Sequence, residues 1–230
     1  MRKLSTSPLI VAAMVFFIVV VPFLPLLITW RWGWWEAWVY GVIAVLGFAV
    51  SRALAARRHP DLLAERARFM RHENTEAWDR VLAPLVALGG GLLPLVAGLE
   101  ARFGWSPTFG LPAKVLALVV MLCGYGLGSY ALMENRYFSG QVRIQADRGQ
   151  QVVASGPYRW VRHPGYAGSI MAYLATPVVL DAVWAFVPAV LLTMAVVIRT
   201  AMEDRTLRER LAGYRDYARH VRYRLVPGVW

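Results

Sequence analysis

The most constraining feature of the sequence is a run of 27 residues without a charged side chain, from Leu4 to Trp30. A helix that crosses the hydrocarbon core of a bilayer needs about 20 mostly apolar residues, so this run is long enough for one crossing. It follows Arg2 and Lys3, as in a secretory signal, but it is too long for one and no small-residue cleavage site follows. We therefore expect it to remain as a membrane anchor.

Five more uncharged stretches follow, at 37–51, 81–99, 115–133, 163–180 and 182–198. The first of these is long enough if Glu36 and Arg52 lie at the headgroups and extend their side chains towards water. The last two are short and only Asp181 separates them, which is typical of a tight helical hairpin. The pattern predicts an all-α polytopic membrane protein with about six transmembrane helices, the last two forming the hairpin.

Composition supports this fold class. Of the 230 residues, 58% are apolar and 17% are charged, whereas an ordinary globular domain has roughly 25% charged residues. A soluble domain and a disordered chain are both excluded. The single cysteine, Cys123, excludes a disulfide framework and a multi-cysteine zinc site, and we expect no metal.

The distribution of the basic residues predicts the orientation in the membrane. If the N-terminus is cytoplasmic, 22 of the 25 Lys and Arg fall in cytoplasmic segments, and only Arg31, Arg102 and Lys114 lie outside. Under the positive-inside rule both termini are cytoplasmic. Topology thus explains the net charge of +11, and a nucleic-acid partner is not expected. The use of 23 Arg against 2 Lys favours a GC-rich bacterial source, and hence a bacterial inner membrane.

Some segments are assigned structural roles. Residues Pro60–Arg71 mix leucines with charges and predict a short helix on the cytoplasmic membrane surface. The glycines at 89–91 and at 124, 126 and 128 lie inside predicted crossings, and we interpret them as helix-packing positions. Five tryptophans at the outer ends of the first two crossings favour an interfacial aromatic belt over a ligand-binding box: Trp30, Trp32, Trp34, Trp35 and Trp38.

The loop before the hairpin contains a candidate anion site. Proline is well tolerated at the first helical position, and the residue before it is disfavoured in a helix, so His163 is expected to precede a helix that Pro164 opens. The free N–H groups of such a helix start can bind a carboxylate or a phosphate. A polar loop over 143–153 and a turn at 155–158 lead up to this point.

The other end of the hairpin contains ionisable residues. Arg199 ends the last crossing, and Glu203 and Asp204 follow four and five residues later. Arg199 and Glu203 share a helix face, which fits a structural ion pair as well as a binding site. The tail predicts an amphipathic helix that lies against the membrane or folds over the loop, as a lid above the cytoplasmic end of the hairpin. Its apolar face is made of Leu207, Leu211, Tyr214, Tyr217 and Val221. Ionisable groups at such a depth favour a functional site.

Three motifs together resemble the isoprenylcysteine carboxyl methyltransferase family, which belongs with the phospholipid N-methyltransferases. They are Gly156-Pro157-Tyr158-Arg159-Trp160-Val161-Arg162-His163-Pro164-Gly165-Tyr166-Ala167-Gly168, then Glu203-Asp204-x-x-Leu207, then Gly213-Tyr214-x-x-Tyr217. The resemblance covers residues 135–230, whereas residues 1–134 match only in being a set of crossings. We therefore divide the chain into an N-terminal transmembrane region, 1–134, and a cofactor-binding region, 135–230.

The resemblance implies methyl transfer from S-adenosyl-L-methionine at the membrane face. It assigns the acceptor to Arg199 and the cofactor to Gln145, Gln150, Gln151, Val152, Val153, Tyr158, His163, Pro164, Gly165, Tyr166, Glu203 and Asp204. Two features depart from the family pattern. Asp204 replaces the second glutamate of the usual pair, and the loop between Gln145 and Gln150 is about two residues shorter than in the eukaryotic enzymes.

The chemistry of the residues agrees with that cofactor. The helix start at Pro164 could bind its carboxylate and Glu203 its ammonium or ribose, while Tyr158 and Tyr166 could flank the adenine. The expected partners are membrane lipids and a small lipophilic acceptor, for which a carboxylate is the first choice. Prenylated-protein carboxylates, phospholipid amines, thiols and isoprenoid or fatty acids all stay open. Two alternatives stay open: an NADPH-dependent reductase, because membrane sterol reductases have a similar C-terminal architecture, and a non-catalytic membrane protein.

Overall fold

The computed structural model describes residues 8–68, 74–105 and 107–230. Arg2, Lys3 and the end of the predicted surface helix at Arg71 lie outside the described residues. Within them the regular structure is helical, with short π and 3-10 turns between the following α-helices: α1 Pro8–Val15, α2 Leu24–Thr29, α3 Trp35–Arg58, α4 Pro60–Ala67, α5 Asp79–Gly89, α6 Leu92–Phe103, α7 Leu111–Glu134, α8 Pro164–Val179, α9 Phe186–Arg210 and α10 Tyr214–His220.

The predicted membrane fold is confirmed in its main features. Five segments of the described chain are long and apolar enough to cross a membrane: Ala12–Thr29, Trp35–Arg58, Asp79–Phe103, Leu111–Glu134 and Phe186–Arg210. Helix α8 has 16 residues, fewer than the roughly 20 that a full crossing needs. Its crossing, and with it the count of six, remains a prediction.

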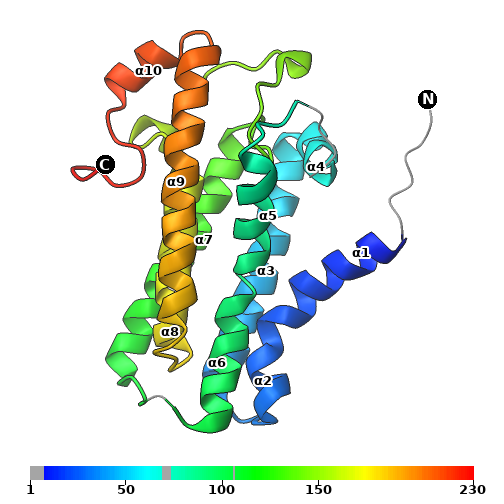
Figure 1. Cartoon of the computed structure of the whole chain (residues 1–230), viewed down its shortest axis with the longest axis vertical. Helices are drawn as coiled ribbons and strands as arrows, with labels where there is room; N and C mark the ends of the chain where they lie inside the picture. The colour runs from blue at the N-terminus through cyan, green and yellow to red at the C-terminus, as the bar shows by residue number, and fades with distance from the viewer. Residues whose placement is uncertain (1–7, 69–73, 106) are drawn as a thin grey trace.

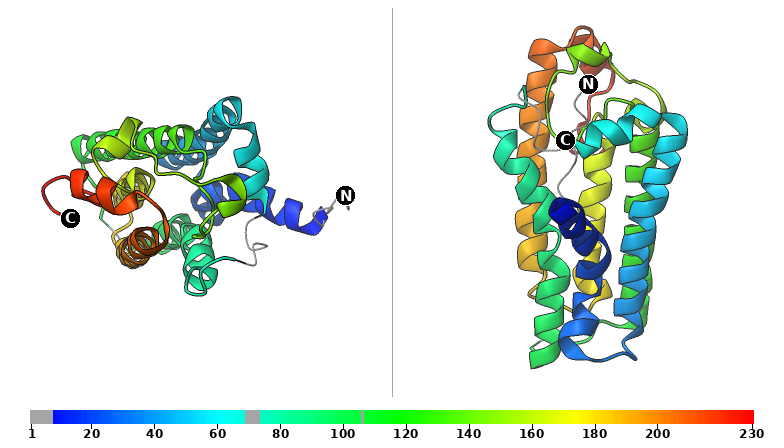
Figure 2. Two further views of the ribbon diagram at one scale, coloured as in Figure 1. Left: turned by 90° about the horizontal axis from the view of Figure 1, so that it is seen from above. Right: turned by 90° about the vertical axis from the view of Figure 1, so that its right-hand side faces the viewer.

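The long helices form an upright bundle with two different ends (Figure 1). Helices α4 and α10 and the loop that leads into α8 gather at one end, which we call the pocket end. The turns between α2 and α3, α6 and α7, and α8 and α9 lie at the opposite end. Helix α1 points away from the bundle, as the two further views also show (Figure 2).

Glycines bring α7 and α8 into close contact. A Cβ built on Gly124 would lie 2.5 Å from the carbonyl oxygen of Gly168, and one built on Gly168 would lie 2.4 Å from that of Gly124. Neither residue leaves room for a side chain, whereas Gly126 faces open space. The interpretation of this glycine string as a packing motif is confirmed for Gly124. A Cβ on Gly128 would meet nothing within 4 Å, although the backbone nitrogen of Gly128 would lie 3.0 Å from a Cβ on Gly168.

Two of the candidate crossings are irregular. The first contains a π-turn at Phe16–Val20 and a 3-10 turn at Val21–Phe23 between α1 and α2. Prolines interrupt the α-helical hydrogen bonds, and Pro22 and Pro25 lie at this irregular stretch. The third is divided into α5 and α6 at Gly90. Gly89 packs there against the side chain of Leu192 in α9, so that this glycine also serves packing.

The hairpin is present, but the tail differs from the prediction. Asp181, with φ of 53°, lies in the turn between α8 and α9. Helix α9 continues to Arg210, and the chain then turns at Gly213 (φ 78°) into the separate, seven-residue α10. The prediction of a single amphipathic helix from Leu207 to Val221 is therefore wrong. The apolar residues still form one cluster, because Tyr214, Tyr217 and Val221 pack with Leu207 and Leu211 across the turn.

A buried ion cluster fixes the opposite end. The ammonium group of Lys114 donates to Glu36 at 2.5 Å and to Asp181 at 2.6 Å, which joins α7 to α3 and to the hairpin turn. The tryptophans lie at this end, and Trp30 is 69% exposed. Trp34 is the exception to the predicted belt, because it is 8% exposed and packs in the core.

Candidate functional site

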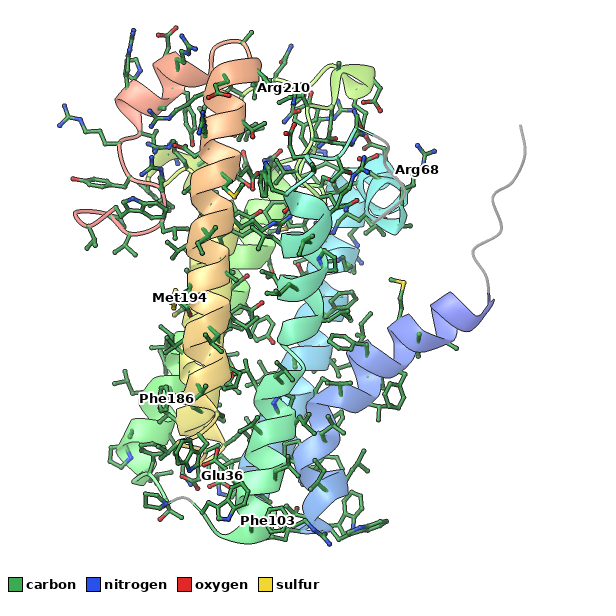
Figure 3. All side chains as sticks on the ribbon, in the orientation of Figure 1. Glu36, Arg68, Phe103, Phe186, Met194 and Arg210 are labelled. Carbon is green, nitrogen blue, oxygen red and sulfur yellow. The ribbon has the colours of Figure 1, made fainter. Side chains whose placement is uncertain are left out.

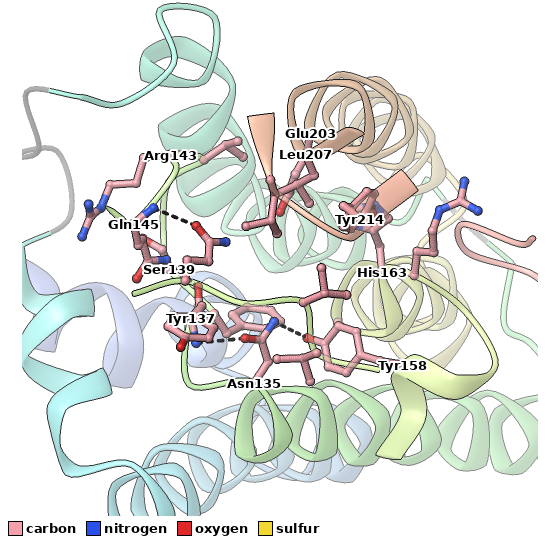
Figure 4. Close-up of a pocket in the computed structure, with 18 of the residues that line it drawn as sticks. Asn135, Tyr137, Ser139, Arg143, Gln145, Tyr158, His163, Glu203, Leu207 and Tyr214 are labelled. Carbon is pink, nitrogen blue, oxygen red and sulfur yellow. Dashed lines mark hydrogen bonds between the residues drawn. The ribbon is translucent and has the colours of Figure 1, made fainter. Parts of the chain in front are cut away.

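One pocket at the pocket end contains most of the predicted site. It has about 790 Å³ of empty space, part of it open to solvent. Its walls come from the loop after α7, the start of α8, α9 and α10 (Figure 4). Eleven of the thirteen predicted residues line it: Gln145, Gln150, Gln151, Val152, Val153, Tyr158, His163, Gly165, Tyr166, Arg199 and Glu203.

The start of α8 forms one wall, as predicted. His163 is the non-helical residue before the helix and Pro164 is its first residue. The N–H groups of Tyr166 and Ala167 both donate to the carbonyl oxygen of His163, at 3.1 Å each. Gly165 lines the pocket, and a Cβ there would lie 2.6 Å from the ring of Phe138. Pro164 opens the helix but is not among the lining residues.

Asp204 has protein partners and lies outside the pocket lining. Its carboxylate accepts from Arg162 Nε at 2.7 Å, from Arg224 Nε at 3.0 Å and from the Tyr214 hydroxyl at 3.0 Å, and it pairs with Arg208. The residue is 1% exposed. A buried carboxylate with this many donors holds the tail against the segment before α8, which is a structural task.

Glu203 and Arg199 make separate contacts. Glu203 accepts the hydroxyl of Tyr166 at 2.6 Å. Arg199 donates to both oxygens of Asp79 in α5, at 2.6 and 2.9 Å, and to the carbonyl oxygen of Gly140 at 3.0 Å. The sequence allowed a structural ion pair between Arg199 and Glu203. Arg199 instead makes its ion pair with Asp79. Sequence reasoning missed Asp79, although an acid at the edge of an apolar stretch was a signal.

The polar loop is held by its own side chains. Gln145, which is 1% exposed, donates from Nε2 to the Tyr137 carbonyl oxygen at 2.7 Å, and its backbone N–H donates to Gln150 Oε1 at 2.7 Å. Arg143 pairs with Glu65 in α4 at 2.8 Å and with Asp147 at 2.7 Å. The sequence prediction missed several lining residues in this loop: Asn135, Tyr137, Phe138, Ser139, Gln141, Val142 and Arg143.

Tyrosines from η4 (Gly156–Arg159) and α10 close the pocket on the tail side. The hydroxyl of Tyr217 donates to the carbonyl oxygen of Tyr158 at 2.7 Å. Asn135 donates to the hydroxyl of Tyr158 at 3.3 Å. Burial raises the pKa of the Tyr158 hydroxyl above its ordinary value, so this group stays a neutral hydrogen-bond donor. Figure 4 shows Tyr158, His163 and Tyr214 on one side of the pocket and Gln145 on the other.

The charges of the pocket are unevenly compensated. Its three arginines each pair with a carboxylate: Arg143 with Glu65, Arg162 with Asp204 and Arg199 with Asp79. Glu203 is the acid among the lining residues, and in the described chain its partner is the Tyr166 hydroxyl rather than a cation. The pocket therefore favours a ligand with positive charge next to Glu203.

Comparison with known proteins supports the motifs. Residues 115–209 match the model of the isoprenylcysteine carboxyl methyltransferase (ICMT) family. This match covers less than half of the chain. The matched residues include most of α7, the loop, α8 and most of α9. They therefore contain Arg199 and Glu203 as well as the lining residues between 135 and 166. Asp79, Glu65 and the two tyrosines of α10 contribute to the site from outside the matched residues.

A second comparison gives a relative of different activity. The chain is 26% identical over 152 residues to the delta(14)-sterol reductase TM7SF2 of Mus musculus. The match covers 60% of this chain and 36% of that protein. The chain thus spans little more than a third of the length of this curated relative.

Proposed function

We propose that this chain is an integral-membrane, S-adenosyl-L-methionine-dependent methyltransferase that acts on a small lipophilic acceptor, most simply a carboxylate. The match to the ICMT family supports methyl transfer in a membrane. The charge asymmetry of the sequence supports a pocket on the cytoplasmic side, with both termini there. The use of 23 Arg against 2 Lys supports a bacterial inner membrane as the location.

The observation that carries this proposal is the charge state of the pocket. The arginines that line it are neutralised by Glu65, Asp204 and Asp79, while Glu203 has no cationic partner among the described residues. S-adenosylmethionine has a sulfonium and an ammonium group, and it suits such a surface. The phosphates of a dinucleotide would find no unpaired arginine among the lining residues.

The other lining residues fit the remaining parts of this cofactor. The helix start at Gly165 suits its carboxylate, because partial positive charge gathers at helix N-termini. The apolar Val152 and the ring of Tyr158 suit its adenine, and the side chains of Gln150 and Gln151 suit its ribose hydroxyls. Tyr166, in the first turn of α8, holds Glu203 in place through its hydroxyl.

The chemistry asks little of the protein beyond positioning. The bound cofactor supplies a methyl group on a positively charged sulfur. An acceptor oxygen would form a bond to the methyl carbon while the carbon–sulfur bond breaks, and the electron pair of that bond would stay on the sulfur. A carboxylate acceptor loses no proton, so no general base is required. The tail tyrosines and the loop would exclude water and align the two reactants.

The reductase alternative has one observation in its favour, the likeness to a sterol reductase. Two titrations on detergent-solubilised protein separate the alternatives. We expect calorimetry to detect micromolar binding of S-adenosylhomocysteine and none of NADPH. Binding of NADPH alone would overturn the proposal. Methyl transfer is then tested with methyl-labelled cofactor and a lipid extract, followed by mass spectrometry of the labelled lipid, which also identifies the acceptor.

A further inference from the structure

Arg199 and Glu203 lie one helical turn apart in α9, and both line the pocket. Opposite charges at this spacing attract each other and commonly form an ion pair. Figure 3 shows mostly carbon atoms around Met194, in the middle of α9, and many nitrogen and oxygen atoms near Arg210, at its pocket end. Arg199 lies between these two residues and is 7% exposed, so water would screen an ion pair with Glu203 only weakly. Such a pair would cancel the negative charge that favours a cation in the pocket.

Contacts with two other residues keep Arg199 and Glu203 apart. Arg199 donates from Nε and Nη2 to the two carboxylate oxygens of Asp79, at 2.6 and 2.9 Å. Glu203 accepts the Tyr166 hydroxyl at 2.6 Å, and the centre of the Tyr166 ring lies 5.3 Å from the guanidinium carbon of Arg199. Tyr166 thus contacts both charged groups. Among the described residues, the carboxylate that pairs with Arg199 is that of Asp79.

Asp79 is held in place by contacts other than the one with Arg199. It is completely buried in the first turn of α5 and accepts the backbone N–H of Val142 at 2.6 Å. The backbone N–H of Glu76 donates to the Val142 carbonyl oxygen at 3.0 Å, which joins the same two segments a second time. Asp79 lies outside the pocket lining, so it acts on a ligand through Arg199. It also lies outside residues 115–209, so the family match assigns it no role.

The ion pair leaves one end of the guanidinium free. Asp79 occupies the edge formed by Nε and Nη2, and Nη2 also donates to the Gly140 carbonyl oxygen at 3.0 Å. The two N–H groups of Nη1 have no hydrogen-bond partner among the described residues. Since Arg199 lines the pocket, Nη1 can donate to the carboxylate of an acceptor. When that carboxylate has become a neutral ester and leaves, Asp79 still compensates the buried charge of Arg199.

We propose that Asp79 is a positioning residue for methyl transfer, which holds Arg199 away from Glu203. Glu203 then keeps its charge for the cationic methyl donor, and Nη1 of Arg199 stays available to the acceptor. This inference rests on the proposed function and names the residue that keeps the donor and acceptor groups separate. Without the charge of Asp79, Arg199 turns to the carboxylate one helical turn away, and the resulting ion pair neutralises both groups at once.

A double-mutant cycle tests this inference, with the affinity for S-adenosylmethionine as the measurement. Asp79→Asn keeps the shape of the side chain and removes the charge that holds Arg199. We expect calorimetry in detergent to show binding weakened about fivefold or more, a typical coupling within one network. In the Glu203→Gln background the same change should cost less than about twofold, because no charge is left for Arg199 to neutralise. A purely structural role for Asp79 would give the same factor in both backgrounds and would exclude it as a positioning residue.

A second variant keeps the test decisive if Asp79→Asn alone does not fold. Asp79→Asn/Arg199→Met leaves no unpaired charge, and it should bind S-adenosylmethionine within about twofold of the parent protein. Clearly weaker binding by this double variant would show that Asp79 serves the site in another way. Unchanged affinity in a folded Asp79→Asn variant would likewise overturn the inference.

Glu65→Gln is the matched control. It also removes a buried carboxylate from an arginine that lines the pocket, Arg143, but that arginine keeps its pair with Asp147. Its affinity for S-adenosylmethionine should equal that of the parent protein, and a loss as large as in Asp79→Asn would contradict a specific role for Asp79. A parent protein that binds no S-adenosylmethionine would refute the proposed function itself, which the first titration detects separately.

Discussion

Asp79 and Arg199 are 120 residues apart in the sequence, and Asp79 accepts two hydrogen bonds from the Arg199 guanidinium, at 2.6 and 2.9 Å. Asp79 also accepts the backbone N–H of Val142 at 2.6 Å. One buried carboxylate thereby joins the start of α5, the middle of α9 and the loop that lines the pocket. The N-terminal helices are thus part of the site, although the family match begins after them.

The first prediction concerns this pair. Asp79→Asn should lower the free energy of unfolding by about 3–5 kcal/mol, because it leaves the Arg199 charge buried without its partner. The double variant Asp79→Asn/Arg199→Met should recover part of the loss, since no uncompensated charge remains. Thermal unfolding in detergent, followed by tryptophan fluorescence, measures both. A single variant as stable as the parent protein would show that the pair contributes little.

The second prediction concerns the charge of Glu203. Glu203→Gln keeps an acceptor for the Tyr166 hydroxyl but removes the charge, so S-adenosylmethionine should bind at least tenfold more weakly, about 1.4 kcal/mol. Tyr166→Phe is the matched variant, because it removes the hydrogen bond and leaves the charge. It should weaken binding less than Glu203→Gln does. The reverse order in isothermal titration calorimetry would mean that Glu203 does not face the cationic part of the cofactor.

The sequence predicted much of the site because its lining residues lie close together along the chain. A helix that begins at Pro164 and a glycine contact at Gly124 follow from local rules on proline, glycine and apolar runs. The partners of Arg199 and Arg143 could not be predicted this way. Asp79 and Glu65 come from other helices, and only the packing of the bundle brings them there. The break at Gly213 was missed because apolar spacing is the same on both sides of a turn.

The third prediction uses the contact between α7 and α8. In Gly168→Ala the new methyl group would lie 2.4 Å from the Gly124 carbonyl oxygen, so the two helices must move apart. We expect a loss of about 1–3 kcal/mol of stability, as in overpacked cores. Cofactor affinity should fall as well, because α8 carries His163 and Tyr166 at its start. Gly126→Ala on α7 is the control, since nothing lies within 4 Å of its Cβ. Equal melting temperatures for the two variants would argue against the close contact.

The fourth prediction concerns the tail. Tyr217→Phe removes the hydroxyl that donates to the Tyr158 carbonyl oxygen at 2.7 Å and leaves that oxygen buried without this donor. Loss of one such bond costs about 1–3 kcal/mol. We expect S-adenosylhomocysteine to bind more weakly and a protease to cleave faster after Arg215 and Arg219. Calorimetry measures the affinity, and limited proteolysis measures the cleavage. Tyr223→Phe, at a more exposed tyrosine, should change neither.

The turn at Gly213 has a consequence for how sequences of this kind can vary. Its φ of 78° is a backbone conformation that residues other than glycine adopt only at a cost. The turn reverses the chain so that Tyr214 and Tyr217 face the pocket. Any replacement there strains the reversal, while a glycine moved by one position would rotate both rings away. Homologous proteins that retain tyrosines at the positions of Tyr214 and Tyr217 should therefore retain the glycine ahead of them. Homologues that lack this glycine should lack both tyrosines.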